Sequence, residues 1–234
     1  GRIPLEGVWP LAPSFDTIGP LARDVGGLEL GMQLLEPGFT AAATAAQRIG
    51  RLRTTADPAI EEAVDRALTA AGFDVVPLEL DLDLGSAAFT TIYFAELKEA
   101  DGGLAEQNPD GVGADIARML AMADLFTPGL EDARRQREQW ITALTAAFAK
   151  VELLALPTLP IFPPRIDTIA DDPTDLVIEL SRFTSPFNAA GTPATAQPVG
   201  VPGSAIPASL QLVGPAGGEE LLVSTARAVE AALS

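Results

Sequence analysis

The sequence contains neither cysteine nor histidine among its 234 residues. Without cysteine, the chain has no disulfide, no thiolate nucleophile and no sulfur ligand for a metal. Without histidine, it has no Ser-His-Asp triad, no Cys-His dyad and no His-ligated zinc site of its own. Any hydrolytic chemistry must therefore use lysine or carboxylate groups, or residues from another polypeptide. We expect no metal and no other cofactor.

Basic residues and long apolar runs are also scarce. The chain contains 15 Lys and Arg residues and 32 Asp and Glu residues, which gives a net charge of −17. Such a surface repels nucleic acid and anionic lipid, and no apolar run approaches the length of a membrane span. We therefore expect neither a nucleic-acid partner nor a membrane. The lack of cysteine is compatible with a cytoplasmic location, which is our expectation.

What the sequence does contain is a pattern typical of an α/β domain. Residues 48–52 and 73–80 read as strands on either side of a helix that Asp57 caps and Gly72 ends. A strand–helix–strand order favours a parallel or mixed sheet covered by helices. We expect one domain over residues 1–234, with a mixed β-sheet core flanked by helices on both faces. Further helices are expected near 19–35, 86–100, 113–126, 130–150, 176–187 and 219–233, and further strands at 151–156, 194–199 and 208–213.

Two parts of the sequence, one near each end, resemble a known family. Residues 7–23 read GVWPLAPSFDTIGPLAR, residues 183–194 read FTSPFNAAGTPA, and residues 207–215 read PASLQLVGP. They resemble, in the same order, segments of the amidase signature family, whose members hydrolyse amides with two serines and a lysine. The resemblance implies that the chain is the C-terminal portion of a single amidase signature domain. Within residues 7–23, Ser14 and Asp16 are read as loop-capping residues.

The family's catalytic residues are missing from the sequence. In the family, the lysine lies on an N-terminal strand and both serines lie on a loop of the type Gly-Gly-Ser-Ser-Gly-Gly, which this chain does not contain. A lysine that accepts a proton must be buried, and neither Lys98 nor Lys150 has a matching context. We expect no catalytic residue in this chain and no amidase activity from it alone.

Two candidate substrate-binding residues lie in the middle of the chain. Tyr93 is in a segment similar to a helix of the family's aminoacyl-tRNA amidotransferase subunits, where the tyrosine lines the substrate pocket. The alternative for Tyr93 is a core aromatic with its hydroxyl at the surface. Arg118 lies in an apolar helical stretch, where its planar fork suits a substrate carboxylate. The alternative for Arg118 is an ion pair, for example with Asp115.

Two further candidates come from the C-terminal motif. The resemblance implies that residues 183–194 form one wall of the acyl pocket, so Thr184 and Phe187 are candidates for substrate contact. The alternatives are helix–strand packing for Phe187 and a turn hydrogen bond for Asn188.

These observations leave three functions open. The first is the C-terminal part of an amidase that converts a small carboxamide to a carboxylate and ammonia or an amine. Its partner would be the N-terminal portion of the same protein, which carries the Ser-Ser-Lys triad, and a homodimer is compatible with the sequence. The second is an amidotransferase subunit of the same family. The third is a non-catalytic scaffold or binding module. In isolation, this portion is expected to expose strand edges and apolar faces.

Overall fold

Five strands form one mixed sheet in the computed structural model, which describes residues 1–170 and 172–234. The strands lie in the order β2-β1-β3-β5-β4. β1 is parallel to β2 and β3, whereas β5 is antiparallel to β3 and β4. The mixed α/β architecture expected from the sequence is therefore confirmed. The strands are β1 Arg48–Leu52, β2 Asp74–Leu78, β3 Leu153–Pro157, β4 Ala194–Val199 and β5 Ala208–Val213.

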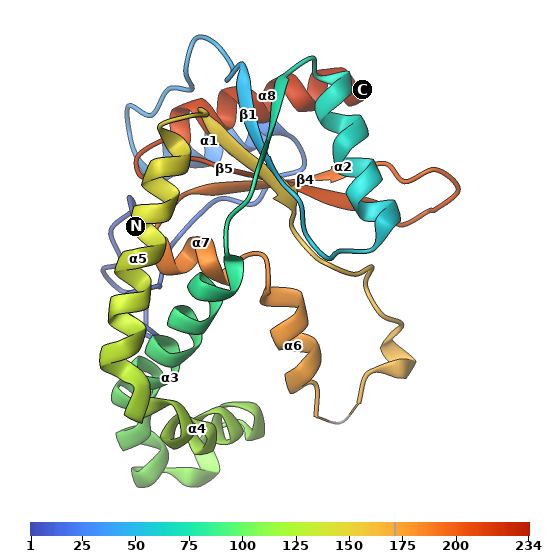
Figure 1. The fold of residues 1–234 in the computed structure, drawn as a ribbon. Helices are drawn as coiled ribbons and strands as arrows, with labels where there is room; N and C mark the ends of the chain where they lie inside the picture. The colour runs from blue at the N-terminus through green and yellow to red at the C-terminus, as the bar shows by residue number, and fades with distance from the viewer. Residues whose placement is uncertain (171) are drawn as a thin grey trace.

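Helices cover both faces of this sheet (Figure 1). α2 and α8 lie on one face and α1 packs on α8, while α5 and α7 lie on the other face and α3 packs on them. The helices are α1 Val25–Leu35, α2 Pro58–Ala70, α3 Leu82–Gln107, α4 Ala114–Phe126, α5 Leu130–Phe148, α6 Thr174–Ser181, α7 Ser185–Ala190 and α8 Glu219–Leu233.

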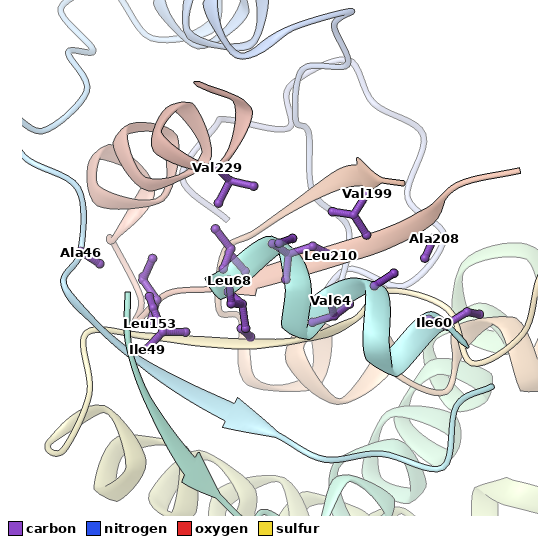
Figure 2. Close-up of a cluster of buried hydrophobic side chains, with 14 of the residues drawn as sticks. Ala46, Ile49, Ile60, Val64, Leu68, Leu153, Val199, Ala208, Leu210 and Val229 are labelled. Carbon is purple, nitrogen blue, oxygen red and sulfur yellow. The ribbon is translucent and has the colours of Figure 1, made fainter. Parts of the chain in front are cut away.

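The core on the first face consists of aliphatic side chains. Ile49, Leu153 and Leu210 point from the sheet toward Val64 of α2 and Val229 of α8, and all five are fully buried. Figure 2 shows Val64 and Leu68 of α2 beside Leu210, with Val229 of α8 above them. Burial of such side chains contributes about 1.5–3 kcal/mol each relative to exposure. This face therefore fixes the sheet against α2 and α8.

The second face has an aromatic core. Leu154 and Leu156 alternate with Leu153 and Ala155 along β3, so they point to the opposite side of the sheet. There they contact a cluster that includes Trp140 of α5 and Phe187 of α7. The full burial of β3 on both faces explains its unbroken apolar sequence.

A buried arginine joins β1 to α2. The Arg51 side chain is only 2% exposed, and its Nε donates to Asp65 Oδ1 at 2.8 Å. Arg51 also forms an ion pair with Glu61, and Arg53 Nη1 contacts Asp65 Oδ2 at 2.6 Å. Burial alone would raise the pKa of Asp65, but the hydrogen bonds from Arg51 and Arg53 outweigh it and hold this pKa below its ordinary value of 3.8. The carboxylate form of Asp65 therefore stabilises the fold.

The stability of the protein should depend on the ionisation of Asp65. Because the folded-state pKa is lowered, this contribution is complete above the unfolded pKa and is lost as the pH falls through the folded pKa. We expect Asp65→Asn to cost stability at pH 7 and to matter progressively less as the pH falls below about 4. Urea unfolding at pH 7 and pH 3 measures this. Asp110→Asn, at an exposed position with no ion pair in the described part of the chain, is the control. An equal cost of Asp65→Asn at both pH values would contradict the prediction.

Three helices differ from the sequence-based expectation. The helix expected from residue 19 begins at Val25, because Asp24 caps it by accepting from Gly27 N at 2.7 Å; Leu21 lies outside it and is fully exposed. The helix expected over 86–100 extends from Leu82 to Gln107. The single helix expected over 176–187 is two helices, α6 and α7. Pro186 causes this break, because proline lacks an N–H and its ring clashes with the preceding turn.

None of the helices within residues 1–170 and 172–234 has both the length and the apolar character needed to cross a membrane.

Candidate functional site

A cleft of about 1270 Å³ lies along β4, which is an edge strand of the sheet. One wall is the N-terminal segment, residues 14–25, together with part of α1. α7 with the preceding Thr184 forms another part of the wall, and the two ends of α8 also contribute residues. The cleft therefore brings together the two stretches of sequence singled out above, residues 7–23 and 183–194.

Thr184 and Phe187 both line this cleft. Thr184 is partly exposed, and its Oγ1 donates to Ser181 O at 3.1 Å. Phe187 is only 2% exposed, and its ring lies 6.1 Å from that of Trp140. Most of the Phe187 ring therefore belongs to the aromatic core, whereas Thr184 is the more accessible of the two to a ligand.

Side-chain donors hold α7 in place from outside the helix. Gln211 Nε2 donates to Phe183 O at 2.8 Å, and Trp140 Nε1 donates to Pro186 O at 2.6 Å. Arg137 Nε donates to Ala189 O at 2.6 Å. Gly85 of α3 allows a close approach, because a Cβ there would lie 2.8 Å from both Pro186 and Trp140. The wall that carries Thr184 is therefore fixed by α3, α5 and β5.

Three polar atoms of the cleft have no hydrogen-bond partner in the described part of the chain. They are Asn188 Oδ1, Thr195 Oγ1 and Gln197 Oε1, and all three are buried. The amide nitrogen of Gln197 is satisfied, since it donates to Ala226 O at 2.9 Å. Buried polar atoms are normally paired, so Asn188, Thr195 and Gln197 are cleft residues that retain hydrogen-bonding capacity.

Acidic residues dominate the charge around the cleft where the chain begins. Arg2 contacts Glu219 at 3.2 Å and Glu220 at 2.6 Å, and also pairs with Glu36. Its hydrogen bonds to Glu220 and Glu36 raise the pKa of Arg2, and Arg2 in turn lowers the pKa of Glu220. Because three carboxylates surround one guanidinium, this end of the cleft keeps a negative charge that suits a neutral or cationic ligand.

Tyr93 lies outside the cleft, in a row of aromatic rings on α3. Its ring stacks on Phe89 at 5.5 Å and meets Phe94 edge-on at 5.4 Å. Burial raises the pKa of the Tyr93 phenol, and the charges of Asp16 and Asp101 raise it further. Tyr93 is thus a half-buried aromatic residue beside the N-terminal segment, and the substrate role predicted for it remains a prediction.

Arg118 also lies outside the cleft. Its side chain on α4 is 39% exposed, and Nη1 lies 3.5 Å from Asp172 Oδ1. The ion-pair partner is therefore Asp172, before α6, where the sequence suggested Asp115. A carboxylate role for Arg118 remains a prediction, and it would apply to a ligand between α4 and α6.

The N-terminal segment is held as a scaffold. Asp16 accepts hydrogen bonds from Leu11 N at 2.9 Å and Ala12 N at 3.2 Å, which confirms its reading as a loop-capping residue. Ser14 N donates to Glu96 Oε2 at 2.8 Å, and its hydroxyl bonds to the same carboxylate. These contacts attach the segment to α3.

Neither lysine is near the cleft. Lys98 is 48% exposed and forms an ion pair with Asp124, and Lys150 is exposed after the end of α5. In residues 1–170 and 172–234, no group of three or more Asp or Glu side chains is arranged to hold a metal ion.

Sequence reasoning missed part of the cleft. Gln197 and Gln211 occupy the middle of strands that are otherwise made mainly of small or apolar residues. A polar amide at such a position needs a specific partner, and this signal could have marked both residues. From the sequence, Asn188 is expected only to form a turn hydrogen bond. Because it lines the cleft and its Oδ1 has no hydrogen-bond partner among the described residues, we add Asn188 to the candidate site.

Comparisons with known proteins identify the type of domain. The model of the family described as Amidase matches residues 1–223. A glutamyl-tRNA(Gln) amidotransferase subunit of Halobacterium salinarum is 32% identical over 132 residues, which cover 54% of this chain and 31% of that protein. The corresponding subunit of Geobacter metallireducens is 25% identical over 282 aligned positions, which cover 99% of this chain and 58% of that protein.

A solved structure has the same fold. A crystal structure of an amidase matches with a TM-score of 0.86 at 24% identity, over 100% of this chain and 57% of that one. The chain thus spans less than two thirds of the length of these relatives.

Proposed function

The chain belongs to the amidase family, and on this premise we propose that it is the C-terminal part of an amide hydrolase. The reaction is cleavage of a carboxamide by water to a carboxylate and ammonia or an amine. The observation that carries the proposal is the family match over residues 1–223. The relatives are longer than this chain, which leaves room for the catalytic portion outside residues 1–234.

In this proposal the two portions have separate tasks. The portion that precedes residue 1 supplies the Ser-Ser-Lys triad and the backbone amides that stabilise the developing oxyanion. Residues 1–234 supply the rest of the sheet and the wall formed by α7, where Thr184 is the residue best placed to contact a small amide substrate. The unpartnered oxygens of the cleft support this division, because the described residues of this chain form no hydrogen bond with them. We further propose a cytoplasmic location, with which the lack of cysteine is compatible.

A serine-directed phosphonate reagent tests where the nucleophile lies. The whole protein that contains residues 1–234 is labelled, digested and analysed by mass spectrometry. We expect one modified serine, outside residues 1–234, in a glycine-rich peptide, and no label on heat-denatured protein. A label on a serine of this chain, such as Ser14 or Ser185, would overturn the proposal. A whole protein that takes no label would favour the scaffold function.

The names of the sequence relatives favour a second candidate, an amidotransferase subunit. Such a subunit releases ammonia for a partner protein, so its activity depends on that partner. Hydrolysis of simple amides by the purified protein alone favours the amide hydrolase. Ammonia release that begins only when partner proteins are added favours the amidotransferase.

A further inference from the structure

Gln211 is a buried amide in the middle of β5. The neighbouring Leu210 and Leu212 belong to the first core, so Gln211 points to the opposite face of the sheet. Phe187 of α7 packs on that face. Gln211 is only 3% exposed, yet it lines the cleft. Because burial of an amide is costly unless its polar atoms are used, Gln211 needs defined hydrogen-bond partners.

A main-chain carbonyl sets the orientation of this amide. Gln211 Nε2 donates to Phe183 O at 2.8 Å. If the amide were turned over, Oε1 would lie against the carbonyl oxygen, and neither atom could supply a proton. Oε1 itself accepts no hydrogen bond from the described residues of the chain. Since Gln211 lines the cleft, Oε1 is the free acceptor that it offers there.

Two hydroxyl groups on the same side of the cleft are also limited to accepting. Thr184 Oγ1 donates to Ser181 O, and Thr192 Oγ1 donates to Phe187 O, each at 3.1 Å. A hydroxyl group has one proton and two lone pairs, so each of these groups has used its only proton on a main-chain carbonyl. Thr184 and Thr192 both line the cleft, where they present lone pairs.

Asn188 adds a further acceptor, one turn after Thr184. Its buried Oδ1 has no hydrogen-bond partner in the described part of the chain. Four side-chain oxygens thus border this side of the cleft: those of Thr184, Asn188, Thr192 and Gln211. We call these four residues the acceptor wall. The only side-chain donors left on them are N–H groups of Asn188 and Gln211, so the acceptor wall suits a ligand that brings its own protons.

We infer that the acceptor wall binds the N–H group of the scissile amide, and that Gln211 determines this specificity through Oε1. The inference rests on the proposed function, because it names the class of amide that the same site takes. That class is primary and secondary amides, which carry an N–H, in preference to tertiary amides and esters. An ester oxygen facing Gln211 Oε1 would leave this buried acceptor without a proton, which costs binding.

The anchoring of Gln211 suits this task. β5 pairs with β3 on one side and with β4 on the other, so the main chain of Gln211 is fixed. The bond to Phe183 O fixes the side-chain amide as well. A recognition group held in this way keeps its position when a substrate binds. Loss of Gln211 has two separable effects: a loosened wall weakens every substrate, whereas a lost acceptor weakens only substrates with an N–H.

A matched pair of substrates distinguishes these effects. The N-methyl amide and the methyl ester of one acid differ only by N–H against O next to the acyl carbon. The acid is the one whose amide the whole protein hydrolyses fastest in a panel of small carboxamides, and kcat/KM is measured for both compounds. We expect Gln211→Met to lower the ratio of amide to ester kcat/KM about 10-fold. A purely structural role of Gln211 lowers both values equally and leaves the ratio unchanged.

Two further variants complete the experiment. Gln139→Met is the matched control, because Gln139 is exposed on α5 and does not line the cleft; we expect it to change neither value. Thr184→Val removes a partly exposed acceptor with little change of shape, and we expect a smaller fall in the same ratio. If Gln211→Met does not fold, Thr184→Val decides the question, since an unchanged ratio there would also contradict recognition of the N–H group.

The outcomes separate the inference from the proposed function. Amide hydrolysis with a ratio that neither Gln211→Met nor Thr184→Val changes overturns only the acceptor wall. A whole protein that hydrolyses no amide of the panel overturns the hydrolase, and the inference with it.

Discussion

Residues 1–234 alone are expected to show no measurable amide hydrolysis, whereas the whole protein that contains them hydrolyses amides. The expected difference is at least on the order of 10⁶-fold in kcat, the scale of loss when a serine hydrolase loses its nucleophile. The measurement is release of ammonia or amine from a panel of small carboxamides. Equal protein concentrations with and without the preceding portion are compared.

The physical reason is the position of the two lysines. A lysine that acts as a base must be neutral, which requires burial away from carboxylates. Lys98 is 48% exposed and paired with Asp124, and Lys150 is exposed beyond α5. Neither lines the cleft. Neither lysine can therefore activate a serine at this site.

The control uses the same lysines in the whole protein. Lys98→Ala and Lys150→Ala should each leave turnover unchanged, because neither residue takes part in the reaction. Two results count against the prediction. One is turnover by residues 1–234 that a serine-directed reagent abolishes, and the other is a large loss of activity in either lysine variant.

Trp140→Ala is expected to destabilise the protein by about 3–5 kcal/mol. For a domain of this size, such a loss lowers the melting temperature by roughly 10 °C. Trp140 is fully buried at the centre of the second core, and its Nε1 donates to Pro186 O at 2.6 Å. The substitution removes the largest side chain of this core and one of the bonds that hold α7. Thermal unfolding followed by circular dichroism measures the effect.

Two further variants separate the causes. Trp9→Ala is the matched control, because Trp9 is 66% exposed and a small effect is expected there. Trp140→Phe keeps most of the packing but loses the hydrogen bond, so we expect an intermediate cost. Similar melting temperatures for Trp140→Ala and Trp9→Ala would show that α7 is held without Trp140.

Local sequence signals predicted the second half of the fold well. The strands at 194–199 and 208–213 and the helix at 219–233 have the expected boundaries. Proline and glycine residues delimit these segments, and the apolar pattern between them is unambiguous. The sequence did not predict the break between α6 and α7. The helical spacing of apolar residues continues across the break, but Pro186 interrupts the helical hydrogen bonding there.

The candidate site was only partly accessible from sequence. Thr184 and Phe187 line the cleft, whereas Tyr93 and Arg118 lie outside it, and the substrate roles of all four remain predictions. The helical periodicity of the sequence shows which side chains of a helix are buried. It does not show which other helices or strands those side chains contact. The position of α3 and α4 relative to β4 depends on packing between residues far apart in the sequence, for example Trp140 with Pro186. No local pattern contains that information.

The strand order has a consequence for synthesis on the ribosome. β1 and β2 lie within residues 48–78 and pair with each other, with α2 between them in the chain, so this unit can form early. β3 follows about 75 residues later and needs β1 on one side and β5 on the other. One edge of β3 therefore stays unpaired until residue 213 has left the exit tunnel. During this interval the nascent chain carries an unpaired strand edge, which makes it prone to aggregation. We expect chaperone binding to have its largest effect on folding at this stage.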